Sequence, residues 1–135
     1  MNKLRFIILS SLLFISAFLQ AQKAEKHSPY IKLITSDSAF ITAIHNHKIV
    51  IVDFWAIWCK PCQFFLPEYE DVAKTFQKKA EFYKLDFDLC KTTAEQYQVL
   101  SIPTIIIFKN GEEVKRYKGL TSKERIIIDL KTIIG

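Results

Sequence analysis

Strand-like and helix-like patterns of hydrophobic residues alternate along most of this chain. The clearest strand pattern is Ile49–Trp55 (IVIVDFW), a nearly unbroken apolar run that is typical of a strand buried on both faces. Another apolar run, Thr104–Phe108, is followed by Asn110-Gly111, a dipeptide that strongly favours a hairpin turn. The remaining strands are predicted over Tyr30–Ile34, Glu81–Asp88 and Glu112–Tyr117.

Helical periodicity occupies the intervals between these strands. After Cys62, apolar residues recur in steps of three and four, which predicts a long helix with one buried face. This face comprises Phe65, Leu66, Tyr69, Val72, Ala73 and Phe76. Pro67 falls inside the pattern and is expected to kink the helix. Shorter helices are predicted from Asp37 to about Ile44, capped by the serines around Asp37, and over Thr92–Gln98.

The last helix is expected to begin at a capping box formed by Thr121 and Glu124. Its buried stripe comprises Ile126, Ile127, Leu130, Ile133 and Ile134. Strands that alternate with helices and end with one hairpin indicate an α/β fold. The pattern therefore predicts a central mixed β-sheet, mostly buried and covered by helices.

The first residues of the chain have the features of a secretory signal peptide. Lys3 and Arg5 precede an apolar run from Phe6 to Leu19, and Ala21 offers a small residue for cleavage. This run is short for a membrane-spanning helix, which needs about 20 apolar residues, although an uncleaved anchor is the alternative. The predicted organisation is a signal peptide over residues 1–21, a loose arm over 22–29 and one domain over 30–135.

The composition excludes several classes of protein. The chain has 135 residues, 50% of them hydrophobic and 24% charged, a balance that suits one domain and excludes a disordered chain. Its 3 glycines and 4 prolines exclude a collagen-like sequence, and 3 cysteines are too few for a disulfide-based scaffold. The net charge of +5 comes without a basic block interleaved with aromatic residues, so we expect no nucleic-acid partner.

The candidate chemistry lies where the strand Ile49–Trp55 meets the long helix. There, the segment WCKPC places Cys59 and Cys62 in a C-x-x-C motif at a helix N-terminus. Free N–H groups of the first turn, the helix dipole and the charge of Lys60 should lower the pKa of Cys59, which then attacks disulfides as a thiolate. Cys62, one turn on and less exposed, can resolve the mixed disulfide, and Pro61 fits the first turn, where a missing N–H costs little.

Two other uses of this cysteine pair remain open from the residues alone. A zinc site needs two further ligands, and the candidates Cys90, His45 and His47 match no common ligand spacing. A purely structural disulfide would stabilise the protein little, because a two-residue loop hardly constrains the unfolded chain. We therefore expect redox chemistry and no metal.

Several motifs, in the right order, resemble the thioredoxin family. They are FWAIWCKPC at Phe54–Cys62, Pro67 shortly after it, SIPT at Ser101–Thr104, FKNG at Phe108–Gly111 and Gly119 before the last helix. The resemblance extends over nearly all of the chain after the predicted signal peptide. It implies the thioredoxin fold, with helices on both faces of the sheet, and no organic cofactor or metal.

The resemblance also implies roles for individual residues. Pro103 would follow a cis peptide bond, and the backbone of Ile102 would pair with an extended substrate segment beside Cys59. Asp53, a carboxyl on a buried strand whose pKa burial should raise, would help to move the proton of Cys62, and Lys84 would face it. The implied substrate-binding residues are Trp58, Lys60, Pro61, Ile102 and Pro103.

Two positions depart from the family pattern. Lys60 stands where the family usually has glycine, and its charge should stabilise the thiolate and make the pair slightly more oxidising. Cys90 is an additional cysteine at the start of the predicted helix Thr92–Gln98. It is either an inert, half-buried thiol or a site of oxidation and intermolecular pairing.

These observations imply an exported, monomeric thiol–disulfide oxidoreductase that reduces disulfides of extracytoplasmic proteins through Cys59 and Cys62. In a periplasmic or similar compartment, its expected partners are disulfide-containing proteins and a membrane protein that re-reduces the pair. Net oxidation or isomerisation of disulfides by the same pair is one alternative. A non-catalytic module that binds proteins through the apolar surface around Trp58 and Ile102 is another.

Overall fold

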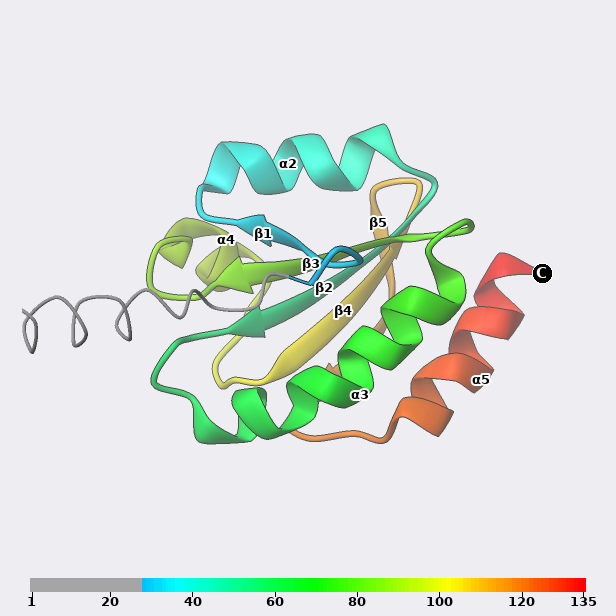
Figure 1. Cartoon of the computed structure of the whole chain (residues 1–135). Coiled ribbons are helices and arrows are strands. Elements are labelled where there is room, and N and C mark those ends of the chain that lie inside the picture. The colour runs from blue at the N-terminus through cyan, green and yellow to red at the C-terminus, as the bar shows by residue number, and fades with distance from the viewer. Residues whose placement is uncertain (1–27) are drawn as a thin grey trace, which may run out of the picture.

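The computed structural model describes residues 28–135, so the predicted signal peptide and most of the predicted arm lie outside the described residues. The described part forms one five-stranded sheet with four helices (Figure 1). In chain order the elements are β1 (Lys32–Ile34), α2 (Asp37–Asn46), β2 (Ile49–Trp55), α3 (Lys60–Phe76), β3 (Glu81–Asp86), α4 (Lys91–Gln96), β4 (Thr104–Lys109), β5 (Glu112–Lys118) and α5 (Lys123–Ile134).

Strand β2 lies at the centre of the sheet, whose order is β1-β3-β2-β4-β5. The first three of these strands run parallel, whereas β4 is antiparallel to both β2 and β5. All residues of β2 are buried, as its apolar sequence predicts. The expected α/β fold with a mixed sheet is therefore confirmed.

Helices cover both faces of the sheet (Figure 1). One core cluster joins α3 and α5 to the sheet residues Ile49, Ile51 and Ile107, and the other joins α2 and α4 to Val50 and Val52 on the opposite face. Within residues 28–135, no helix is sufficiently long and apolar to span a membrane.

Strand ends were predicted less well than strand positions. Strand β1 begins only at Lys32, because residues before it form a turn in which Ile31 N–H donates to the Ser28 carbonyl at 3.4 Å. Strand β3 ends at Asp86, two residues before the predicted end. The Asp86 carboxylate accepts hydrogen bonds from the N–H groups of Asp88 and Leu89 at 2.9 and 3.2 Å and so turns the chain.

The predicted capping box at the start of the last helix is wrong. The N-cap of α5 is Ser122, whose hydroxyl accepts a hydrogen bond from Arg125 N–H at 3.4 Å. The Thr121 hydroxyl is buried and has no hydrogen-bond partner within residues 28–135. The alternative alignment places Arg125 at the position where a capping box needs Glu or Gln, so only the Ser122 half of the motif forms.

Candidate active site

The cysteine pair lies at the N-terminus of α3, immediately after the loop that leaves β2. Cys59 and Cys62 form a disulfide, with their Cα atoms 5.3 Å apart. Cys59 is the N-cap residue of α3, and its Sγ accepts a hydrogen bond from Cys62 N–H at 3.3 Å. The sulfur therefore occupies the position in which a helix N-terminus stabilises an anion.

Local hydrogen bonds hold this turn in place. Cys59 N–H donates to the Ala56 carbonyl at 3.0 Å, and the Gln63 side chain donates to the Ile57 carbonyl at 2.6 Å. Pro61 lies in the first turn of α3, where its missing N–H leaves no helical hydrogen bond unmade. Hydrogen bonds from Cys59 and from Gln63 thus fix the loop between β2 and α3.

Burial of the two cysteines differs from the prediction. Cys59 is 4% exposed and Cys62 is 3% exposed, so Cys62 is not appreciably less accessible in this oxidised state. The reason is that both sulfurs pack into one small cluster with Trp55 and Ala56, against which Ile102 also packs. Ile102 is therefore one of the residues that flank the disulfide.

The segment that carries Ile102 has the predicted backbone geometry, since the Ile102–Pro103 peptide bond is cis. Two hydrogen bonds fix the residues around it. The Thr104 hydroxyl donates to the Ser101 carbonyl at 2.7 Å, and Gly119 N–H donates to the Pro103 carbonyl at 2.8 Å. This segment brings Ile102 against the disulfide cluster.

Trp58 extends from the active-site loop into solvent and is 61% exposed. Its indole N–H donates to the Asp88 carboxylate at 2.7 Å, a bond that links the loop to the turn after β3. The predicted strand Glu81–Asp88 ends at Asp88, and its sequence pattern does not indicate this contact. An acidic residue two positions after the true strand end is the available signal, although Trp58 and Asp88 are 30 positions apart.

Asp53 is an ionisable group inside the core. It is 1% exposed, and its Oδ1 atom has no hydrogen-bond partner within the described residues. Burial raises the pKa of Asp53 from 3.8 to about 7, and the positive charge of Lys84 partly opposes this shift. Near neutral pH the carboxyl can therefore either hold or release a proton.

Lys84 is the register partner of Asp53 on β3, as expected for a residue that faces it. The two side chains point to the same face of the sheet, because paired residues on neighbouring strands share a face. Lys84 Nζ also lies 3.5 Å from the centroid of the Trp55 ring, a cation–π contact that holds the ammonium group over the indole.

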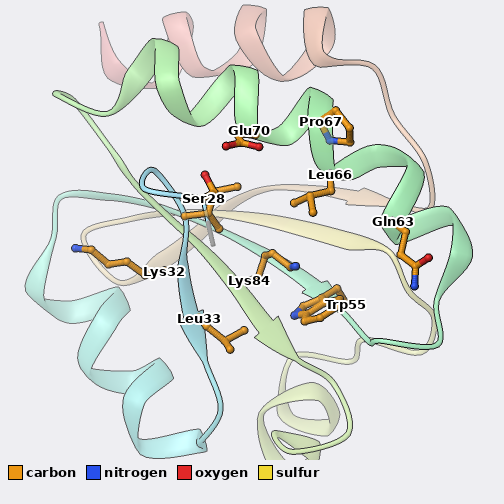
Figure 2. Close-up of a pocket in the computed structure, with 10 residues that line it drawn as sticks. Ser28, Lys32, Leu33, Trp55, Gln63, Leu66, Pro67, Glu70 and Lys84 are labelled. Atoms are coloured by element: carbon orange, nitrogen blue, oxygen red, sulfur yellow. The ribbon is translucent and has the colours of Figure 1, made fainter. Parts of the chain in front are cut away.

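A cavity of about 340 Å³ opens between α3 and the β1 side of the sheet (Figure 2). Trp55 and Lys84 form part of its wall. The other lining residues are Ser28, Ile31, Lys32 and Leu33 from the segment that includes β1, and Gln63, Leu66, Pro67 and Glu70 from α3. Trp55 follows Asp53 by two positions on β2, so two close neighbours of the buried carboxyl line this cavity.

Cys90 is the N-cap residue of α4 and is fully buried, not half-buried as one alternative supposed. Burial raises the pKa of its thiol to about 11, and the charges of Asp37 and Asp86 act in the same direction. It packs in the core cluster on the α2 and α4 face, whereas the disulfide lies in a separate cluster. The folded protein therefore keeps Cys90 as an enclosed, protonated thiol.

The remaining zinc-ligand candidates do not gather around the disulfide. His45 is in the last turn of α2 and His47 is its C-cap residue. Within residues 28–135, no three His, Cys, Asp or Glu side chains form a group that could hold a metal ion.

Comparisons with known proteins agree with this geometry. The family model Thioredoxin matches residues 31–132. The chain is 43% identical over 91 residues to the thioredoxin of Staphylococcus epidermidis, an alignment that covers 67% of this chain and 86% of that protein. It is 38% identical over 101 residues to the bifunctional thioredoxin reductase/thioredoxin of Mycobacterium leprae, covering 75% of this chain and only 22% of that larger protein. A mutant thioredoxin from Halobacterium salinarum has a similar structure, with a TM-score of 0.73 and 26% identity over 82% of this chain and 97% of that one.

The buried carboxyl predicts a specific pH dependence of stability. Between pH 3.8 and about 7 the folded state retains the Asp53 proton that the unfolded state has released, so stability should fall as pH rises. Replacing Asp53 with Asn removes this effect. We expect the variant to exceed the wild type in unfolding free energy by up to about 4 kcal/mol above pH 7, a gap that shrinks toward pH 4.

Urea unfolding of the oxidised protein across this pH range measures the gap. Glu95→Gln is the matched control, because it makes the same chemical change at an exposed carboxyl. A gap between Asp53→Asn and the wild type that stays constant with pH would show that Asp53 does not titrate as described.

Proposed function

This chain belongs to the thioredoxin family, and we propose that its Cys59–Cys62 pair reduces disulfide bonds of proteins outside the cytoplasm. Family membership and the disulfide-forming pair make it a thiol–disulfide oxidoreductase. The observation that carries the proposal is the position of Cys59 Sγ, at the N-cap of α3 and within hydrogen-bonding distance of a backbone N–H.

In the proposed cycle, the Cys59 thiolate attacks one sulfur of a substrate disulfide. The substrate S–S bond breaks, a mixed disulfide with Cys59 forms, and the other substrate sulfur leaves as a thiolate that takes up a proton. Cys62 then attacks Cys59 Sγ and releases the second substrate sulfur, which is also protonated. The substrate gains two electrons and two protons, and Cys59 and Cys62 end as the disulfide.

The Cys62 proton must leave before Cys62 can attack. The pKa of Asp53 near neutrality makes this carboxylate a suitable acceptor, because it is basic enough to take a proton and acidic enough to release it again. Lys84 and Trp55, which are close neighbours of Asp53 and line the adjacent cavity, mark the route by which this proton reaches solvent. In this proposal Lys84 tunes the carboxyl through its charge.

Substrate is proposed to bind as an extended segment beside the disulfide. Ile102 packs against the disulfide cluster, and a strand-like pairing with its backbone would place a substrate disulfide near Cys59. Such pairing uses hydrogen bonds to the substrate main chain and depends little on substrate side chains, so it suits many protein substrates. Exposed Trp58, Lys60 and Pro61 would form the other side of the binding surface.

The site of action is proposed from the N-terminal sequence. A secretory signal over residues 1–21 would deliver the protein to a compartment in which disulfides persist. Reduction there consumes the dithiol form, which must be restored from outside. A membrane protein that passes on electrons from the cytoplasm as a dithiol is the proposed partner.

Substitution of one cysteine at a time tests whether Cys59 attacks the substrate and Cys62 resolves the mixed disulfide. Cys62→Ser should accumulate a covalent adduct between Cys59 and a substrate protein, because the attacking thiol remains and the resolving thiol is lost. Cys59→Ser is the matched control and should accumulate none. Adducts are measured as bands on non-reducing gels that disappear after treatment with dithiothreitol.

Equal adduct formation by both variants would contradict the assigned order of attack.

Exposed apolar side chains near the site, including Trp58 and Phe64, favour a second candidate function as a non-catalytic binding module. If the variant lacking both cysteines retains full cellular activity, that second function replaces the proposed one.

Export makes a separate prediction. When the full chain is expressed in a bacterium, protein recovered from outside the cytoplasm should begin at Gln22, as measured by N-terminal sequencing. Leu13→Arg, which interrupts the apolar run with a charge, should leave the chain uncleaved in the cytoplasm. A wild-type chain that keeps Met1 and remains in the cytoplasm would refute export, and an uncleaved chain in the membrane fraction would identify an anchor.

A further inference from the structure

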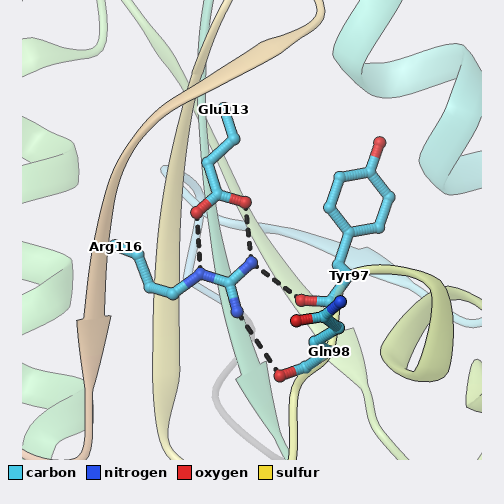
Figure 3. Close-up of polar contacts among 4 residues, drawn as sticks. All are labelled: Tyr97, Gln98, Glu113 and Arg116. Atoms are coloured by element: carbon cyan, nitrogen blue, oxygen red, sulfur yellow. Dashed lines mark hydrogen bonds and ion pairs between the residues drawn. The ribbon is translucent and has the colours of Figure 1, made fainter.

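A charged pair on β5 holds the start of the segment that carries Ile102 (Figure 3). Arg116 and Glu113 form a bidentate ion pair, with Nε to Oε1 and Nη2 to Oε2 distances of 2.7 Å each. The same guanidinium donates from Nη2 to the Tyr97 carbonyl at 2.7 Å and from Nη1 to the Gln98 carbonyl at 3.5 Å. One side chain therefore bridges β5 and the end of α4.

The two carbonyls that Arg116 binds lie where α4 stops and the chain turns toward the active site. Tyr97 is the C-cap residue of α4, and Gln98 has a φ of +52°, in the left-handed region. Val99 N–H donates back to the Ala94 carbonyl at 2.8 Å, which closes the helix. Carbonyls at a helix C-terminus lack helical partners and carry partial negative charge, so a guanidinium is well suited to them.

Strand β5 also holds the far end of this segment. Gly119, immediately after β5, donates its N–H to the Pro103 carbonyl at 2.8 Å. Between the two fixed ends, Leu100 is 91% exposed and Ser101 is exposed as well. Residues 99–102 are thus a short span between two attachments, one to β5 and one to the residue that follows it.

We propose that Arg116, oriented by Glu113, is a positioning residue that fixes residues 98–103 so that the Ile102 backbone can pair with substrate. This inference rests on the proposed function, because it assigns a purpose to the contact in substrate reduction. Arginine is required for geometric reasons: its planar group serves the Glu113 carboxylate and both carbonyls at once, whereas a lysine ammonium has no such fork.

Substrates with and without peptide groups separate positioning from chemistry. Insulin offers a polypeptide disulfide, whereas bis(2-hydroxyethyl) disulfide has no backbone to pair with Ile102. For Arg116→Gln we expect the KM for insulin to rise about tenfold, with kcat and the rate with the small disulfide changed less than about twofold. Arg116→Lys should resemble Arg116→Gln, and Glu113→Gln should show a smaller change of the same kind. Arg125→Gln, at an exposed arginine on α5, is the matched control and should match the wild type.

Amide hydrogen exchange provides a readout that does not depend on activity. The amides of Leu100, Ser101 and Ile102 should exchange faster in Arg116→Gln, while those of β2 keep the wild-type rate. An unchanged KM for insulin, or an equal loss with both disulfides, overturns the inference. If wild-type protein fails to reduce insulin, the proposed function fails instead. Unchanged amide exchange in Arg116→Gln would then show separately that the Arg116–Glu113 ion pair does not hold residues 98–103.

Discussion

The complete burial of β2 is the constraint on which the site depends. Because this central strand is buried on both faces, its end fixes where the loop to Cys59 begins. Cys59 is the N-cap residue of α3, so its sulfur lies at the positive end of the helix dipole. The same burial gives Asp53 a pKa of about 7, far above that of an exposed carboxyl. In the proposed cycle, one structural feature thus supplies both a stabilised thiolate and a proton acceptor.

Hydrogen bonds to other parts of the chain hold the segments around the site. The Trp58 indole donates a hydrogen bond to the Asp88 carboxylate, and Gly119 N–H donates to the Pro103 carbonyl. The Arg116 guanidinium donates to the Tyr97 carbonyl at the end of α4. These bonds join segments that are distant in sequence but close in the fold.

Local pattern was enough to predict much of this structure. The apolar run of β2 and the C-x-x-C motif before a helical face each lie within a few residues, so they predicted the strand and the helix start. The cis bond before Pro103 was predicted only from the resemblance of SIPT to the thioredoxin family. The contact between Arg116 and the Tyr97 carbonyl could not be predicted, because the two residues are 19 positions apart and no motif links them. The α5 cap failed for another reason: Thr121 and Ser122 are adjacent hydroxyls, and only packing decides which of them caps the helix.

The direction of electron flow is the central claim, and the reduction potential of the Cys59–Cys62 pair tests it most directly. Residues 22–135 would be equilibrated with dithiothreitol or glutathione redox buffers, with Cys90→Ser as a control for the additional thiol. A potential near that of thioredoxin, about −270 mV, is the predicted result and would establish a reductant that needs an outside electron supply. A potential near that of DsbA, about −120 mV, would contradict this account and identify a donor of disulfides.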